Sequence, residues 1–176
     1  MTPLRRKAPG FTLFETLIVI AIIGALVAMV IPVTSSFLKK SRQATCLGNL
    51  RQIGIAIESY LQDHNQIMPN LEAGRNSRSE EVPVMDNTLI DYLSNEEVFH
   101  CPEDKILFRD TGSSYLWNST QSNRPRHRLA FFNVRGDPAR VPLVSDKEAW
   151  HPGEGGVNIL YADFTSSQDS KFTTTP

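Results

Sequence analysis

The segment ETLIVIAIIGALVAMVIPVTSSFLK, residues 15–39, decides the architecture of this chain. Between Glu15 and Lys39 lie 23 residues, 16–38, none of which carries a charge. A helix of that length spans about 35 Å, which exceeds the bilayer's hydrocarbon core of about 30 Å. A buried core helix is the alternative, but a helix of a soluble domain normally keeps a polar face. The segment therefore predicts a membrane helix.

The flanks of this segment differ from those of a cleaved secretory signal. Basic residues precede it at positions 5–7, but the apolar run exceeds the roughly 7–15 residues of such a signal, and no small-x-small site follows. Three more basic residues stand beyond the run, at positions 39, 40 and 42. Because the two sides carry equal basic charge, the positive-inside rule does not fix the orientation.

Composition sets outer limits on the rest of the chain. The 176 residues carry a formal net charge of −1, with 40% apolar residues. This length allows one ordinary domain with an extra helix. The near-zero charge excludes a protein that holds nucleic acid by a global positive field, and the composition excludes wholesale disorder. Two cysteines do not make a disulfide framework, and no CxxC pair indicates zinc.

Glu15 is out of place at the start of the apolar run. An ionised carboxylate in a membrane helix costs about 2.5–3.5 kcal/mol near the centre and less near an end, so such a residue usually has a partner. The alternative is a residue that only marks the membrane interface.

The string KAPGFTLFETLIVIAIIGALVAMVIP, residues 7–32, resembles the amino terminus of type IV prepilins and type II secretion pseudopilins. The shared features are a short basic leader ending in Gly10, Phe11 directly after it, Glu15 as the fifth residue from Phe11, and a long apolar helix. The resemblance implies a leader over residues 1–10, a transmembrane and assembly helix over 11–38, and a globular domain over 39–176. It also implies a single pass through the inner membrane, with the globular domain in the periplasm.

The resemblance also assigns roles to individual residues. A prepilin peptidase is implied to cut between Gly10 and Phe11 and to methylate the new amino group of Phe11. Glu15 is implied to pair with that amine on a neighbouring subunit, and a carboxylate in lipid does need a cation. Pro32 stands where such proteins carry a helix-kinking proline. The implied partners are the peptidase, other pilin or pseudopilin subunits, an inner-membrane assembly platform and membrane lipid.

Residues 39–64 continue the helical pattern with one apolar stripe. Apolar positions recur at spacings of three and four, namely Leu47, Leu50, Ile53 or Gly54, Ile57, and Tyr60 or Leu61. One helix over about residues 11–63 is therefore expected, its second half packed on a globular domain. Gly48 and Gly54 each cost about 1 kcal/mol against alanine in a helix, so we expect them to allow another element to pack closely, with local fraying of the helix as the alternative.

The remaining chain has the pattern of short strands between turns. Residues 65–88 predict a loop, and 89–93 a helical turn with Asp86 or Asn87 as its cap. Extended segments are expected at residues 114–117, 128–134, 142–145 and 157–162. Together these segments predict an antiparallel sheet, and the long helix on it makes an α+β domain, the pilin-like fold that the resemblance implies.

The globular part also resembles a subgroup of these proteins. The similar strings are residues 46–69, FHCPEDK (99–105), SYLWN (114–118) and VPLVSD (141–146). HPGEGGVNILYAD, residues 151–163, resembles the subgroup's carboxy-terminal motif, a histidine followed after a glycine-rich spacer by Asp-Gly. Eleven residues separate His151 from Asp163, where the family usually has nine, and Phe164 stands in the glycine's place. The tight turn that glycine's positive φ would permit is therefore left open.

Cys46 and Cys101 are the only cysteines in the chain. A domain outside the inner membrane allows a disulfide. Closing a loop of about 55 residues would contribute roughly 4 kcal/mol in the chain-entropy model. Two buried free thiols are the alternative, and we favour the disulfide.

Other chemistry-bearing residues give weaker signals. The four histidines, 64, 100, 127 and 151, lack HxH or HExxH spacing, so we expect no metal site and no cofactor. Major pseudopilins often bind calcium near the carboxy terminus, and Asp137, Asp146, Asp163 and Asp169 could supply its oxygen ligands. No comparable loop motif is present, so calcium is the less favoured alternative. We expect Asp146 and Asp163 to end strands and accept hydrogen bonds from turn amides. Ser114, His151 and Asp146 are the residue types of a hydrolase triad, but no GxSxG context accompanies them.

These observations predict a structural subunit of a secretion or type IV pilus filament, not an enzyme. The alternative is a single-pass, membrane-anchored periplasmic domain with a binding or enzymatic role. The arginine-containing loop over residues 118–129 is interpreted as solvated, so no specific nucleic acid is expected as a partner. The sequence does not distinguish type II secretion from a type IV pilus or a competence filament.

Overall fold

The computed structural model describes residue 10, residues 12–153 and residues 155–172. The chain divides into two compact units, Met1–Leu38 and Lys39–Pro176. A single helix, α1 (Leu13–Asp63), contributes its first part to one unit and its second part to the other. The helix is continuous through Pro32, so it does not end there, and a kink at this residue stays a prediction.

In the first unit, apolar side chains are exposed on every face of α1. Leu13, Ile20, Leu26 and Met29 are among the exposed large apolar residues. Among the described residues, α1 is the helix long and apolar enough to cross a membrane. A uniformly apolar sequence forms a helix without an inward face, so these side chains are not buried by the chain itself.

The second unit combines the rest of α1 with short helical turns and strands. Its α-helices are α2 (Met85–Thr88) and α3 (Leu107–Thr111). Its strands are β1 (Tyr115–Trp117), β2 (Ala130–Phe131), β3 (Val134–Arg135), β4 (Pro142–Asp146), β5 (Ile159–Tyr161) and β6 (Ser166–Ser167). The described residues of this unit also form five 3₁₀ turns: η1 (Ile90–Tyr92), η2 (Glu96–Phe99), η3 (Ser119–Gln121), η4 (Arg126–Arg128) and η5 (Pro138–Arg140).

The main sheet is antiparallel and has the strand order β1–β4–β5–β6. Its register places Tyr115 opposite Asp146 and Ile159 opposite Ser145. The pairing of β4 with β5 shifts between Pro142 and Val144, which fits a proline at the first strand position, because proline has no amide proton to donate. A long helix followed by a small antiparallel sheet confirms the predicted α+β fold class.

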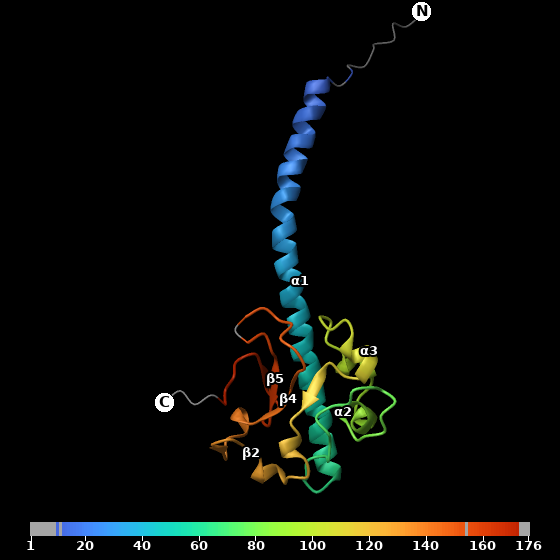
Figure 1. Ribbon diagram of the computed structural model, residues 1–176. Helices are drawn as coiled ribbons and strands as arrows, with labels where there is room; N and C mark the ends of the chain where they lie inside the picture. Colours follow the sequence, from blue (N-terminus) through green and yellow to red (C-terminus); the bar gives the residue numbers. More distant parts are fainter. Residues whose placement is uncertain (1–9, 11, 154, 173–176) are drawn as a thin grey trace, which may run out of the picture. The chain divides into compact units, whose positions relative to one another are not determined.

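The core lies between the sheet and the second half of α1, and Figure 1 shows β4 and β5 beside this part of the helix. The buried hydrophobic side chains of the helix are Cys46, Leu50, Ile53, Ala56, Ile57 and Leu61. The predicted stripe is thus confirmed from Leu50 onward, but Cys46, not Leu47, occupies its first buried position.

The two helix glycines differ in their surroundings. A Cβ added at Gly54 would lie 3.2 Å from Leu160 Cδ1 and 3.3 Å from Phe164 Cβ, so the absent side chain does let β5 approach α1. A Cβ at Gly48 would meet nothing within 4 Å. The packing role expected for both glycines is therefore confirmed for Gly54 and wrong for Gly48.

Two local predictions are also wrong. Residues 128–134 do not form one strand: η4 ends at Arg128, and β2 and β3 pair as a hairpin. Phe132 has a φ of 47°, so the chain reverses at Phe132-Asn133, a turn that Asn133 could have signalled. In the other case, the helical turn expected at residues 89–93 is present as η1, but the predicted cap is wrong: α2 precedes the turn, and Leu89 is its N-cap residue without a side-chain hydrogen bond. Asn87 Oδ1 accepts from the Val84 amide, while Asp86 pairs with Arg75 instead of capping a helix.

The carboxy-terminal turn forms despite the missing glycine. Phe164 adopts a φ of 63°, and its amide donates to the Tyr161 carbonyl at 2.8 Å. The Arg126 guanidinium lies over the Phe164 ring, 5.1 Å from its centroid. The strained backbone is thus accompanied by side-chain packing that a glycine would not provide.

Candidate functional site

The start of α1 is closed by a reciprocal pair of hydrogen bonds between Thr12 and Glu15. The Glu15 amide donates to Thr12 Oγ1 at 3.2 Å, and Glu15 Oε2 accepts from the Thr12 amide at 2.9 Å. The Thr12 hydroxyl also donates to Glu15 Oε2 at 2.9 Å. This is the capping box of a T-x-x-E sequence, in which the two residues satisfy amide groups that the first turn leaves unpaired. The sequence TLFE carried this signal, and sequence reasoning missed it.

The cap leaves part of the Glu15 carboxylate open. The hydrogen bonds that the described residues make to Glu15 reach Oε2, and the side chain is exposed. Oε1 therefore has capacity to accept a hydrogen bond from outside the chain while Oε2 holds the cap. No cation from the described residues of the first unit is bonded to it.

The other predicted amino-terminal residues have less structural description. Gly10 is exposed, and a Cβ added to it would meet nothing within 4 Å. Phe11 lies outside the described residues. Cleavage after Gly10 and methylation of Phe11 stay predictions.

In the second unit, Cys46 and Cys101 form a disulfide with Cα atoms 5.1 Å apart. Both cysteines are fully buried. The bond joins α1 to the segment that follows η2, across 55 residues of chain. This is the pairing that the sequence favoured over two free thiols.

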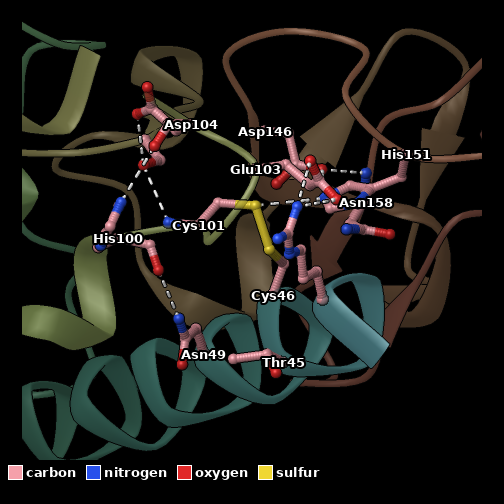
Figure 2. The surroundings of a disulfide bond; sticks show 12 residues. Thr45, Cys46, Asn49, His100, Cys101, Glu103, Asp104, Asp146, His151 and Asn158 are labelled. Atoms are coloured by element: carbon pink, nitrogen blue, oxygen red, sulfur yellow. Dashed lines mark hydrogen bonds and ion pairs between the residues drawn. A yellow bond between two sulfur atoms is a disulfide. The ribbon is translucent and has the colours of Figure 1, made fainter. Parts of the chain in front are cut away.

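His151 and Asp146 approach this disulfide from the sheet side, as Figure 2 shows. His151 Nε2 lies 3.3 Å from Cys101 Sγ and 3.4 Å from Asp146 Oδ2. Asp146 Oδ2 also accepts from the Asn158 amide at 2.6 Å, which ties the end of β4 to the residue before β5. We call Cys46, Cys101, Asp146 and His151 the disulfide cluster.

The glycine-rich spacer explains why His151 reaches this position. The His151 amide donates to the Gly156 carbonyl at 3.0 Å, closing the loop on itself. Gly156 has a φ of 62°, and a Cβ there would come within 2.9 Å of the His151 carbonyl oxygen. Glycine is therefore required at this position for the loop to turn His151 inward.

Several buried polar atoms at this cluster have no hydrogen-bond partner among the described residues. They are His151 Nδ1, Asp146 Oδ1, both side-chain polar atoms of Asn158, and Tyr115 Oη nearby in β1. Buried polar groups are normally paired, so this group of unpaired atoms is unusual.

Burial also shifts the ionisation of the cluster. It raises the pKa of Asp146 to about 7, although the hydrogen bond from the Asn158 backbone amide acts in the other direction. It lowers the pKa of His151, against the raising effect of the Glu103 charge. Each group thus disfavours its charged form.

Asp104 holds the chain that follows Cys101. Its carboxylate accepts from the Ser114 hydroxyl at 2.6 Å and from three amides, those of Ile106, Leu107 and Phe108. Burial acts to raise the pKa of Asp104, but these hydrogen bonds outweigh it and hold the pKa below the ordinary value. Because the Ser114 hydroxyl donates to Asp104, the residue types of a hydrolase triad are not assembled around this serine.

The four aspartates considered as calcium ligands accept hydrogen bonds from other residues of the second unit. Asp146 ends β4 and accepts from the Asn158 amide, as expected. Asp163 Oδ1 accepts from the Thr165 turn amide at 3.0 Å, as expected, but β5 ends at Tyr161, so Asp163 does not end a strand. Asp137 and Asp169 likewise bond to nearby residues, Ala139 and Ser167. Among the described residues, the group of potential metal ligands that does converge is Cys46, Cys101 and His151. These three residues lie 50 residues or more apart in the sequence, so no short metal-binding motif marked them.

Fold and site together define a class: a chain whose apolar, membrane-length helix is capped by Glu15 and continues into a small disulfide-bonded α+β domain. A profile for the prokaryotic N-terminal methylation motif matches residues 5–31. The type II secretion system core protein G of Pseudomonas aeruginosa is 33% identical over 70 residues, 40% of this chain.

These matches confirm the resemblance to prepilin-type proteins and pseudopilins predicted from residues 7–32. The chain spans about half the length of that curated relative, 49%. No solved structure matches the chain significantly.

Proposed function

We propose that this chain is a pilin-like structural subunit that is processed by a prepilin peptidase and assembled into a filament through α1. The observation that carries the proposal is the start of α1, where Glu15 follows Gly10 by five positions and opens a charge-free apolar helix within a matched methylation motif. The proposed role is mechanical, and it involves no catalytic group of this chain.

The exposed apolar surface of the first unit supports assembly and membrane anchoring. Side chains such as Leu13, Met29 and Ile31 remain more than half exposed in the single chain. Burying each large apolar side chain contributes about 1.5–3 kcal/mol, so lipid or the helices of other subunits would stabilise this segment strongly. In the proposed life cycle, lipid covers the segment before assembly, and neighbouring α1 helices cover it afterwards.

The geometry of Glu15 supports pairing with another subunit. Cleavage after Gly10 would create an amino terminus at Phe11, one residue before the cap residue Thr12. Glu15 Oε2 holds the cap, and Oε1 is open to accept from the amine of a neighbour. Neutralising the carboxylate in this way would remove the main electrostatic cost of placing it in an apolar filament core.

The second unit would be the part of the subunit that meets the aqueous side. The disulfide joins the segment after η2 to α1, so a load on the helix would also pass to the folded domain through this covalent bond. A periplasmic location, which allows such a bond, agrees with this arrangement.

The similarity to a type II secretion protein favours a secretion filament as the system served. The proposed partners are then a prepilin peptidase, an inner-membrane assembly platform and other pseudopilin subunits. A type IV pilus or competence filament would use the same amino-terminal features.

The test separates the charge of Glu15 from its capping role. Glu15→Gln keeps an oxygen for the capping box but removes the charge, whereas Thr12→Ala weakens the cap and keeps the charge. We expect Glu15→Gln to abolish filament assembly, measured by cross-linking between neighbouring subunits, while the chain stays in the membrane. Thr12→Ala should retain most of the assembly. Glu58→Gln, on the second half of α1, is the matched control and should assemble normally.

Processing is read from the same cells by mass spectrometry of the amino-terminal peptide. The expected peptide begins at a methylated Phe11. Normal assembly of Glu15→Gln would contradict the pairing, and an uncleaved amino terminus in cells that hold the peptidase would contradict the processing. Either result would favour a membrane-anchored binding domain over a filament subunit.

A further inference from the structure

We propose that, when the Cys46–Cys101 disulfide is reduced, the two cysteine sulfurs, His151 and Asp146 form a four-ligand site for Zn²⁺. The disulfide links α1 to the segment after η2, and the zinc site would link both of them to the end of β4 through Asp146. This inference is independent of filament assembly.

The residue types match a zinc site. Two thiolates, one imidazole nitrogen and one carboxylate oxygen are ligands that zinc accepts in four-coordinate sites. Ligand atoms of Cys46, Cys101 and His151 lie within 4.8 Å of one another, and all three residues are buried. Asp146 is not part of this group of three, and it adjoins the group through His151 Nε2, which lies 3.4 Å from Asp146 Oδ2. The side chains of His151 and Asp146 are fully shielded from solvent.

The spacing around His151 already fits tetrahedral coordination. Metal–ligand bonds of about 2.0–2.3 Å place neighbouring ligand atoms about 3.3–3.8 Å apart at tetrahedral angles. His151 Nε2 lies 3.3 Å from Cys101 Sγ and 3.4 Å from Asp146 Oδ2, as the dashed lines in Figure 2 show. Once the bond between the sulfurs is broken, their separation would increase to the same range.

The unpaired polar atoms are a second, independent observation. His151 Nδ1 and Asp146 Oδ1 are buried without a partner among the described residues, and so are the side-chain atoms of Asn158. These atoms are not the proposed ligand atoms, which are His151 Nε2 and Asp146 Oδ2. They show that the surroundings of the disulfide cluster are polar and incompletely paired, so the site has capacity for a further polar species.

Formation of the site requires two balanced steps. A dithiol reductant transfers two electrons and two protons to the disulfide, becomes a disulfide itself, and leaves Cys46 and Cys101 as thiols. Zn²⁺ then binds both sulfurs, and the two thiol protons leave to solvent as the metal–sulfur bonds form. His151 binds in its neutral form through Nε2, and ionised Asp146 supplies the fourth ligand.

The experiment uses the full chain in detergent micelles, reduced anaerobically with a phosphine that is then removed. Co²⁺ is the probe, because tetrahedral cobalt–thiolate coordination gives visible d–d bands and a thiolate charge-transfer band that Zn²⁺ abolishes by displacement. We expect these bands at one Co²⁺ per reduced chain. The oxidised chain, which has the same sequence, should give none.

Two variants link the signal to this cluster. His151→Gln in the reduced chain should weaken Co²⁺ binding by about tenfold or more, whereas His100→Gln, outside the cluster, should leave it unchanged. Circular dichroism follows folding in parallel, because a reduced chain that has loosened should refold when the metal binds. Absence of the bands and of metal-induced refolding would overturn the proposal. Equal affinity of His151→Gln and the wild type would also overturn it, since unfolded thiols alone would then explain binding.

Discussion

Leu26 and Leu50 lie on the same helix and illustrate its two different halves. Leu26 is 59% exposed, whereas Leu50 is completely buried against the sheet. The first half of α1 is apolar on all faces, while the second half alternates an apolar stripe with polar residues. A helix stripe specifies a core within the same chain, whereas a uniformly apolar helix requires surroundings that the chain itself does not supply. Four sets of substitutions sharpen this contrast.

The largest expected effect concerns the disulfide of the second unit. The double variant Cys46→Ala/Cys101→Ala removes a link across 55 residues, so we expect the free energy of unfolding of this unit to fall by about 4 kcal/mol. Urea unfolding of the full chain in micelles, followed by Trp117 and Trp150 fluorescence, measures it. An unchanged urea midpoint would show that the contacts of α1 with the sheet suffice without the bond.

The comparison of the two leucines gives the next effect. Leu50→Ala should lower the free energy of unfolding of the second unit by about 2–5 kcal/mol, because it leaves a cavity in a fully buried site. Leu26→Ala should leave that unfolding transition unchanged. The same urea titration distinguishes the two variants. A comparable loss for Leu26→Ala would mean that the two halves of α1 are not energetically separate.

A smaller effect is expected at Asp104, and it depends on pH. At pH 7, Asp104→Asn should lower the free energy of unfolding by about 1–3 kcal/mol. The side-chain NH₂ of asparagine would then face backbone amides or a hydroxyl that donate to the carboxylate in the wild type, and these donors would lose their acceptor. The hydrogen bonds to the carboxylate, which outweigh the opposing effect of burial, give Asp104 a lower pKa in the folded state than in the unfolded state. Its stabilisation is therefore present above the unfolded pKa of about 3.9 and is lost as the pH falls through the folded value.

Urea midpoints at pH 7 and at pH values below the unfolded pKa check this sign. The difference between the wild type and Asp104→Asn should shrink as the solution is acidified. Asp110→Asn, at an exposed position of α3, is the matched control and should change stability by no more than about 0.5 kcal/mol. A difference that stays constant with pH would contradict the role given to the charged carboxylate.

The same contrast explains which features the sequence predicted. Each half of α1 repeats its own pattern over several turns, so the end of the helix at Asp63 and its buried face from Leu50 were predictable. Strands β1, β4 and β5 were also found, because turn residues surround each of them. The two-residue strands β2, β3 and β6 are too short to carry a period, and the β2–β3 hairpin was predicted as one strand.

The candidate site was predictable only in parts. The cysteine pair followed from counting, and the resemblance identified Glu15 and singled out His151. The convergence of His151 with Cys101, Asp146 and Asn158 could not be inferred, because it depends on strand register and on a loop turned by Gly156. Tertiary packing across about 50 residues leaves no spacing signal in the chain.

The smallest expected effect compares Gly48 with Gly54 on the second half of α1. Alanine is favoured over glycine in a helix by about 1 kcal/mol, so Gly48→Ala, with nothing within 4 Å of the new Cβ, should stabilise the second unit by about that amount.

At Gly54 the same gain is opposed by contacts of 3.2 Å with Leu160, in β5, and 3.3 Å with Phe164, in the turn that follows β5. Overpacking costs about 1–3 kcal/mol, which offsets or exceeds the helix gain of about 1 kcal/mol. Gly54→Ala should therefore lower the free energy of unfolding of the second unit by up to about 2 kcal/mol. Urea midpoints of the two variants decide the sign. Equal stabilisation by both would show that the sheet yields at Leu160, and that the close approach of β5 to α1 does not depend on the missing side chain.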